Sequence, residues 1–185
     1  MSSRTNIDLV EESDRGCILV AAAVLETRMS NIFQEQFKQH NISTKLQKSI
    51  FSVLGPLGSF SSKIKLAFAL GYISKKSYED LDIIRKLRNK AAHTTSDFDF
   101  LDKKISNNIE KLNCIVPFKG GIKRYNAPKN VPKPKEAHLR VAGYVKYIKS
   151  IISLGITYLD FILECEASGV DSNEIEKTFI EEISS

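Results

Sequence analysis

The sequence contains only three cysteines among its 185 residues, and they lie far apart at Cys17, Cys114 and Cys165. No CxxC pair and no cluster of cysteine with histidine accompanies them. Neither a disulfide framework nor a zinc site is therefore predicted, and we expect reduced core cysteines in a cytoplasmic protein.

Long apolar runs are also scarce. The two longest, residues 17–25 and 151–163, fall short of the ~20 residues that cross a bilayer, and Asp160 interrupts the second. The amino terminus is polar and acidic, so no secretory signal is predicted. We expect a soluble protein without a membrane partner.

Common catalytic and cofactor signatures are absent. The sequence has no GxxxxGK[ST], GxGxxG, HExxH or GxSxG. We predict neither a bound metal nor a cofactor.

What the sequence does contain is unevenly placed charge, with a formal net charge of +5. Residues 41–78 carry six lysines and no acid, whereas residues 160–182 carry eight acids and one lysine. Such segregation suits an anionic partner, RNA or DNA included, or docking with another copy, although solvated faces without a partner are the alternative. The candidate binding residues are Lys63, Lys65, Lys119, Lys123, Arg124, Lys129, Lys133 and Lys135.

Apolar residues recur with a period near 3.6 and predict an all-α protein without strands. The predicted helices cover residues 14–39, 45–54, 63–70, 74–92, 98–112, about 136–168, and a short acidic segment within 170–185. We expect a single domain over residues 1–185, a bundle of about six to seven helices with one long C-terminal helix. Residues 116–135, which hold four of the five prolines, form a basic loop.

Particular residues are expected to bound these helices. The string Gly55-Pro56-Leu57-Gly58 should end the second helix, and Gly71 and Gly169 should end the third and sixth. The expected N-caps are Ser61 or Ser62, Ser74 or Ser77, Ser96 or Asp97, and Ser172.

The segment from Leu87 to His93 could carry chemistry. Arg88 can clamp a phosphate bidentately, Asn89 can orient a ligand, and His93 can act as a general acid or base. Arg88 and His93 lie about 140° apart on an ideal helix, so they converge only if the helix unwinds near Ala92 or a second subunit completes the site. The alternative is that Arg88 pairs with an acid and His93 simply ends the helix.

A DNA-reading helix-turn-helix over residues 63–92 is disfavoured. Its second helix would present Glu79, Asp80 and Asp82 where phosphates require cations. At the start of a helix these acids instead complement the macrodipole.

Residues 14–93 resemble the mannitol operon repressor family of bacterial all-helical proteins. The likeness is carried by residues 14–22, 25–26, 54–64, 69–71 and 82–85, together with Arg88-Asn89 and His93. The resemblance implies a cytoplasmic transcriptional regulator of sugar-alcohol uptake that acts through a protein partner. The Arg88-Asn89-xxx-His93 pattern is also similar to that of HEPN domains, helical dimers that often cleave RNA, and this similarity makes Glu26 the candidate acid.

Three functions follow. The leading hypothesis is a non-enzymatic regulator of the mannitol-repressor type, acting as a homodimer through protein contacts. The alternative is a metal-independent ribonuclease that uses Arg88, Asn89, His93 and Glu26. The third is a nucleic-acid-binding module without catalysis.

Overall fold

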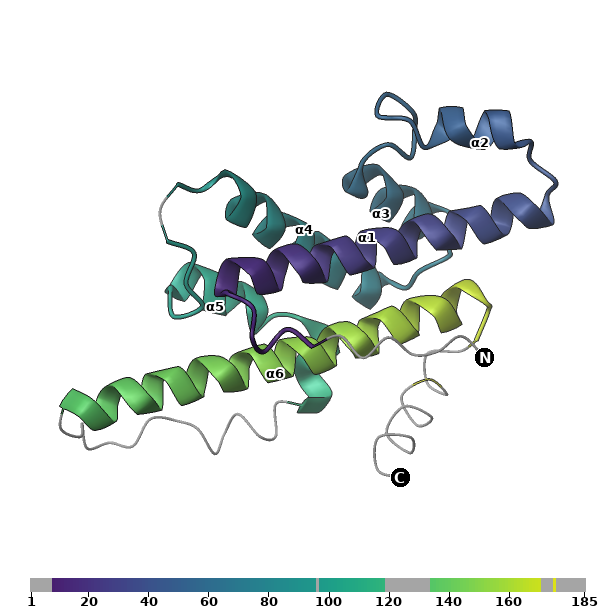
Figure 1. Ribbon diagram of the computed structural model, residues 1–185. Helices are drawn as coiled ribbons and strands as arrows, with labels where there is room; N and C mark the ends of the chain where they lie inside the picture. The colour runs from purple at the N-terminus through teal and green to yellow at the C-terminus, as the bar shows by residue number, and fades with distance from the viewer. Residues whose placement is uncertain (1–7, 96, 119–133, 171–174, 176–185) are drawn as a thin grey trace.

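The computed structural model describes residues 8–95, 97–118, 134–170 and 175, with the backbone alone for 134–142, and these residues form six α-helices and no strand. Figure 1 shows their arrangement. They are α1 (Asp14–Gln39), α2 (Thr44–Ile50), α3 (Phe60–Ala69), α4 (Lys75–His93), α5 (Lys103–Ile109) and α6 (Pro134–Ala167). The predicted helical bundle with one long C-terminal helix is confirmed.

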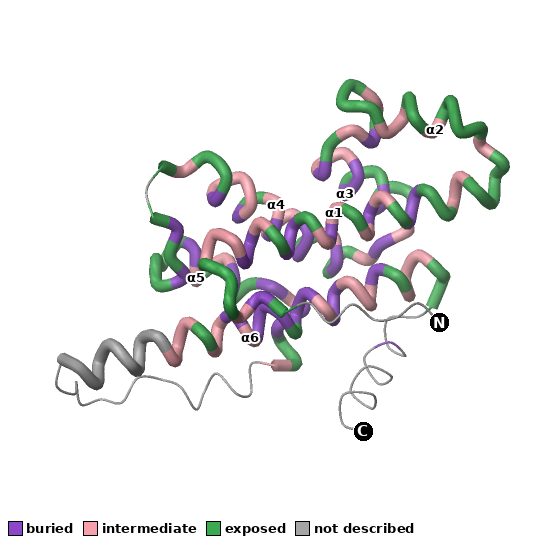
Figure 2. Tube along the Cα trace, viewed as in Figure 1, coloured by how far each residue is buried: buried purple, intermediate pink, exposed green. Residues whose placement is uncertain are grey.

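Helix α1 lies at the centre of the bundle and packs against α3, α4 and α6. Its buried residues recur every three or four positions and so form a stripe along one side of the helix. Buried segments of α4 and α6 face this stripe, and Figure 2 shows the buried residues gathered where the three helices meet. In α1 the stripe comprises Cys17, Ile18, Ala21, Ala22, Leu25, Met29, Ile32 and Phe33.

Polar contacts fix the direction of the neighbouring helices. Asp14 pairs with Lys149 at 3.2 Å near the start of α1, and Arg28 forms two hydrogen bonds of 2.7 and 2.8 Å to Asp160 further along. Because residue numbers increase in the same direction along the two helices from the first contact to the second, α6 runs parallel to α1. Arg15 donates to the carbonyl oxygens of Ala91 and Thr94, so α4 runs antiparallel to α1.

A buried carboxylate holds the chain after α5 against α4. Asp80 is 1% exposed, and its oxygens accept hydrogen bonds from the backbone N–H groups of Asn113 and Cys114. The macrodipole role predicted for Glu79, Asp80 and Asp82 is wrong, because α4 begins at Lys75 and its first turn contains no acid.

Several predicted helix boundaries are corrected. Helix α3 begins at Phe60 with Ser59 as N-cap, in place of Ser61 or Ser62, because the Ser59 hydroxyl accepts from the Ser62 N–H. Helix α5 begins only after Asp102, whose carboxylate caps it, in place of Ser96 or Asp97. Residues 98–102 are instead irregular and bury Phe98 and Phe100.

Other boundaries hold. Ser74 is the N-cap of α4, and Gly71 and Gly169 follow α3 and α6 with φ of 75° and 81°, the left-handed backbone that favours glycine. The α2 prediction ran too long, because the helix ends at Ile50 and residues 51–59 turn back. The predicted basic loop at 116–135 is shorter at both ends, because residues 116–118 belong to a 3₁₀ helix and α6 begins at Pro134. Its residues 119–133 lie outside the described part of the chain, as does the predicted acidic helix at 170–185 apart from Val170 and Ile175.

Among the described helices, α1 is the one whose length and composition would allow it to cross a membrane. In the bundle it packs its apolar stripe against α3, α4 and α6, as the core helix of a soluble protein does.

The three cysteines form no disulfide, and Cys17 and Cys114 are buried while Cys165 is partly buried. Burial raises the pKa of the Cys17 thiol from 9.0 to about 12, against a smaller lowering by the Lys149 cation. The folded chain therefore keeps a proton that the unfolded chain loses above pH 9.

We expect this proton to make the protein less stable at alkaline pH. Because the folded-state pKa of Cys17 lies above its unfolded value, the free energy of unfolding should fall between pH 9 and 12, by at most about 1.4 kcal/mol per pH unit. Urea unfolding of the wild type and Cys17→Ala from pH 8 to 10.5 tests this. The variant should show the flatter dependence, and parallel curves would contradict the assignment.

Candidate functional site

The predicted polar trio lies on the last two turns of α4, and the helix continues without a break through His93. Arg88 and Asn89 are half-buried, and the Arg88 Nη1 donates to the Asn89 Oδ1 at 3.3 Å. His93 is exposed, and its side chain makes no hydrogen bond or ion pair with any described residue. The helix does not unwind near Ala92, so one chain alone does not bring Arg88 and His93 together.

The end of α4 is instead occupied by a residue that sequence reasoning did not single out. The Arg15 guanidinium donates to the carbonyl oxygens of Ala91 at 2.6 Å and Thr94 at 3.0 Å. These carbonyls lack partners within the helix, so Arg15 both caps α4 and ties it to α1.

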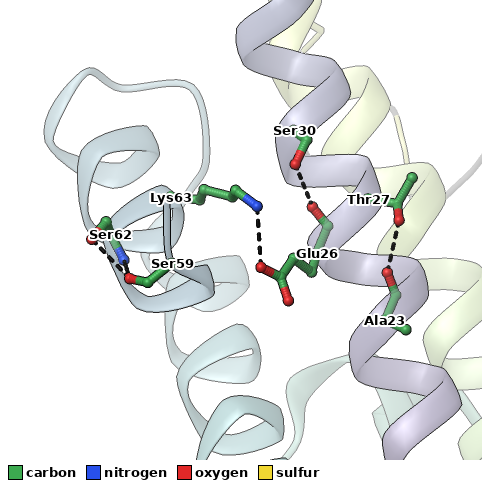
Figure 3. Close-up of polar contacts among 7 residues, drawn as sticks. All are labelled: Ala23, Glu26, Thr27, Ser30, Ser59, Ser62 and Lys63. Atoms are coloured by element: carbon green, nitrogen blue, oxygen red, sulfur yellow. Dashed lines mark hydrogen bonds and ion pairs between the residues drawn. The ribbon is translucent and has the colours of Figure 1, made fainter. Parts of the chain in front are cut away.

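Glu26 lies on α1 and has a different partner from the one the ribonuclease hypothesis requires. Figure 3 shows Lys63 reaching from the first turn of α3 to Glu26, with Nζ and Oε1 3.1 Å apart. The Lys63 side chain is 10% exposed and that of Glu26 28%. The pair therefore joins α1 to α3 in a partly buried position.

The serines around this pair serve local structure. The Ser59 hydroxyl lies 2.8 Å from that of Ser62, and Ser30 donates to the Glu26 carbonyl one turn earlier in α1 (Figure 3). These hydroxyls satisfy backbone and neighbouring groups, as serines at helix starts and on helix faces commonly do.

The predicted basic binding residues differ in where the structure places them. Lys63 is buried against Glu26, and Lys65 is exposed on α3. The side chain of Lys135 and the residues Lys119, Lys123, Arg124, Lys129 and Lys133 lie outside the described part of the chain.

Residues 42–58, which we call the projection, lead away from the end of α1 and turn back over its C-terminal half in the view of Figure 1. Helix α2 within it has no buried residue. The base is held by the Phe51 ring, 5.9 Å from that of Phe37, and by Leu57, which is 2% exposed. The projection is thus anchored at one side and open to solvent at the other.

Two glycines fix the shape of the projection. A Cβ atom at Gly55 would collide with the carbonyl oxygens of Ser49 and Ile50, and one at Gly58 would collide with that of Ser52. The Leu57 N–H bonds to the Ile50 carbonyl at 3.0 Å, closing the turn. These close approaches explain why the Leu54-Gly55-Pro56-Leu57-Gly58 string needs glycine at both positions.

The tip of the projection is apolar. Val53 is 91% exposed and Leu54 98%, the highest values among the large apolar side chains described. Six of the eleven exposed members of this class lie between residues 46 and 70, so apolar exposure is concentrated here. The six are Leu46, Val53, Leu54, Leu66, Phe68 and Leu70.

Sequence reasoning missed the exposed tip because it extended the second helix through Leu54, where an apolar residue would be expected to pack. The available signals were the Gly-Pro-Leu-Gly string, which predicts a turn, and the lack of any acid over residues 41–78. Neither signal says which of Val53, Leu54 and Leu57 faces the core.

Comparison with known proteins places this chain among bacterial repressors. The model of the family described as Mannitol repressor matches residues 9–162. The chain is 23% identical over 149 residues to the mannitol operon repressor of Escherichia coli strain K12, covering 78% of this chain and 72% of the relative. The mannitol operon repressor of Escherichia coli O6:H1 matches to the same extent.

A solved structure shares the fold. The chain in the X-ray structure of the MtlR–HPr complex from Escherichia coli matches with a TM-score of 0.62 and 22% identity, covering 80% of this chain and 88% of that one. The family resemblance inferred from residues 14–93 is confirmed and extends well beyond them. Nothing in these comparisons supports the ribonuclease alternative.

The Glu26–Lys63 pair yields a stability prediction. Glu26→Ala should lower the free energy of unfolding by about 1–3 kcal/mol, because it leaves the buried Lys63 cation without its partner. Lys63→Met should cost less, since it removes the cation and keeps the apolar stem. Urea unfolding measures both, and Glu26→Leu combined with Lys63→Met should recover most of the loss. If Glu26→Ala lowered the free energy of unfolding by no more than Lys63→Met does, a structural role for the pair would be contradicted.

Proposed function

Because this chain belongs to the mannitol repressor family, we propose that it represses an operon for sugar-alcohol uptake by binding a protein partner. The observation that supports the proposal best is the match of the family model to residues 9–162, which includes the whole of α1 to α5 and most of α6. The partner we propose is HPr, because the relative from Escherichia coli was solved in complex with it.

The surface chemistry of α4 supports a protein contact over direct DNA reading. Lys75 lies 3.9 Å from Glu79, and Asp82 binds both Arg85 and Lys86 at 2.7 and 2.8 Å. Three cations of this helix are therefore paired with acids of the same helix, and a reading helix would need such cations for phosphates and base edges.

We expect the protein to act in the cytoplasm, where transcription takes place, and we expect it to form a homodimer. A dimer could also bring Arg88 of one subunit towards His93 of the other, which a single continuous α4 does not do. The ribonuclease alternative requires that the wild type cleave total RNA in the presence of EDTA and that His93→Ala abolish this cleavage.

HPr binding tests the proposed function directly. Purified full-length protein immobilised on a biosensor should bind HPr from the same bacterium saturably, and deletion of the gene should raise expression of the operon. An unrelated small acidic protein at the same concentration is the control.

Absence of HPr binding would contradict this proposal. Tight binding of the protein alone to operator DNA, with an affinity that falls steeply as salt rises, would favour direct nucleic-acid recognition in its place.

A further inference from the structure

We propose that the projection, residues 42–58, is the surface that binds the protein partner. Val53 and Leu54 enter an apolar recess on the partner, and carboxylates at the rim of that recess meet Lys45 and Lys48. This inference rests on the proposed function, since it names the place on this chain at which the HPr contact is made.

The first argument is the exposure of the tip. A large apolar side chain that is almost wholly in water gains nothing from the fold, and Val53 and Leu54 stand side by side in this state. Leu46, 49% exposed on α2, adds to the same projection. Clustered exposure of this kind marks interaction sites, whereas single exposed apolar residues are ordinary.

The second argument is rigidity. Gly55 and Gly58 let the backbone fold back onto the carbonyls of residues 49–52, and Leu57 and Phe51 anchor the base. A turn fixed in this way holds Val53 and Leu54 outward before any partner arrives, so binding loses little conformational entropy.

The third argument is charge. Lys45 and Lys48 are exposed on α2, within the projection, and no acid occurs in the sequence of residues 41–78. A complementary partner surface therefore carries carboxylates around its recess. A second copy pairing tip to tip would bring lysine against lysine, which disfavours symmetric self-association through this surface.

The experiment measures HPr affinity for the full chain by biosensor, with Leu54→Asp and Val53→Asp as test variants. Each should weaken binding about tenfold or more, because a charge replaces an apolar anchor. Lys45→Glu with Lys48→Glu should also weaken binding, and more strongly at low salt than at high salt. Because these side chains are exposed, circular dichroism should show unchanged thermal unfolding.

Leu101→Asp is the matched control. Leu101 is 44% exposed and lies just before α5, beside the start of α1 and so at the opposite end of that helix from the projection. This variant should bind HPr as the wild type does.

The outcomes separate the two proposals. If the wild type binds HPr and the tip variants bind equally well, the projection is not the docking surface, and the proposed function stands. If the wild type does not bind HPr, the proposed function fails, and this inference fails with it. If the tip variants bind HPr normally but change the molar mass in light scattering, the projection joins copies of this chain, and the inference is overturned. If the double lysine variant bound HPr with unchanged affinity, the proposed contact of Lys45 and Lys48 with carboxylates of the partner would be overturned.

Discussion

The packing of α1 between α4 and α6 is the constraint on which the rest of the structure depends. Its apolar stripe supplies the centre of the core, and Arg28 with Asp160 and Asp14 with Lys149 set α6 parallel to it. Partly buried pairs of this kind add modest stability, but they strongly disfavour a shifted register, because each charge would then lie buried without its partner. The apolar stripe supplies the driving force, and the ion pairs select one arrangement.

This arrangement also decides what the polar residues within the family likeness do. Arg15 is used to cap α4, and Glu26 is used to hold Lys63, so two charged residues within the family likeness serve the joints between helices. Arg88 and Asn89 bond to one another on a continuous helix, and His93 lies exposed at its end. Among the described residues, exposed large apolar side chains are concentrated on the projection and on α3 with its C-cap.

Much of this fold could be predicted from the sequence because apolar residues recur along its long helices with a period near 3.6. The bounds of α1 and the N-cap of α4 followed from apolar periodicity and from serine before a helix. Prediction failed at residues 98–102, where Phe98 and Phe100 are buried by an irregular chain whose apolar spacing also fits a helix. It also failed at Leu54, because periodicity assigns apolar residues to a buried face. Leu54 is nevertheless 98% exposed, and its exposure is set by the tertiary structure.

The candidate site was harder to predict because pairing across helices is not visible in one sequence. Glu26 and Lys63 are 37 positions apart, and Asp80 meets its backbone donors at Asn113 and Cys114 only in the folded chain. Charge segregation marks residues 41–78 as basic, and a partner contact there stays a prediction. The measurement that tests the central claim most directly is hydrogen–deuterium exchange of the full chain with and without HPr. Slower exchange confined to residues 42–58 and their surroundings is the predicted result, and protection at the end of α4 around Arg88 and His93 with none at the projection would contradict it.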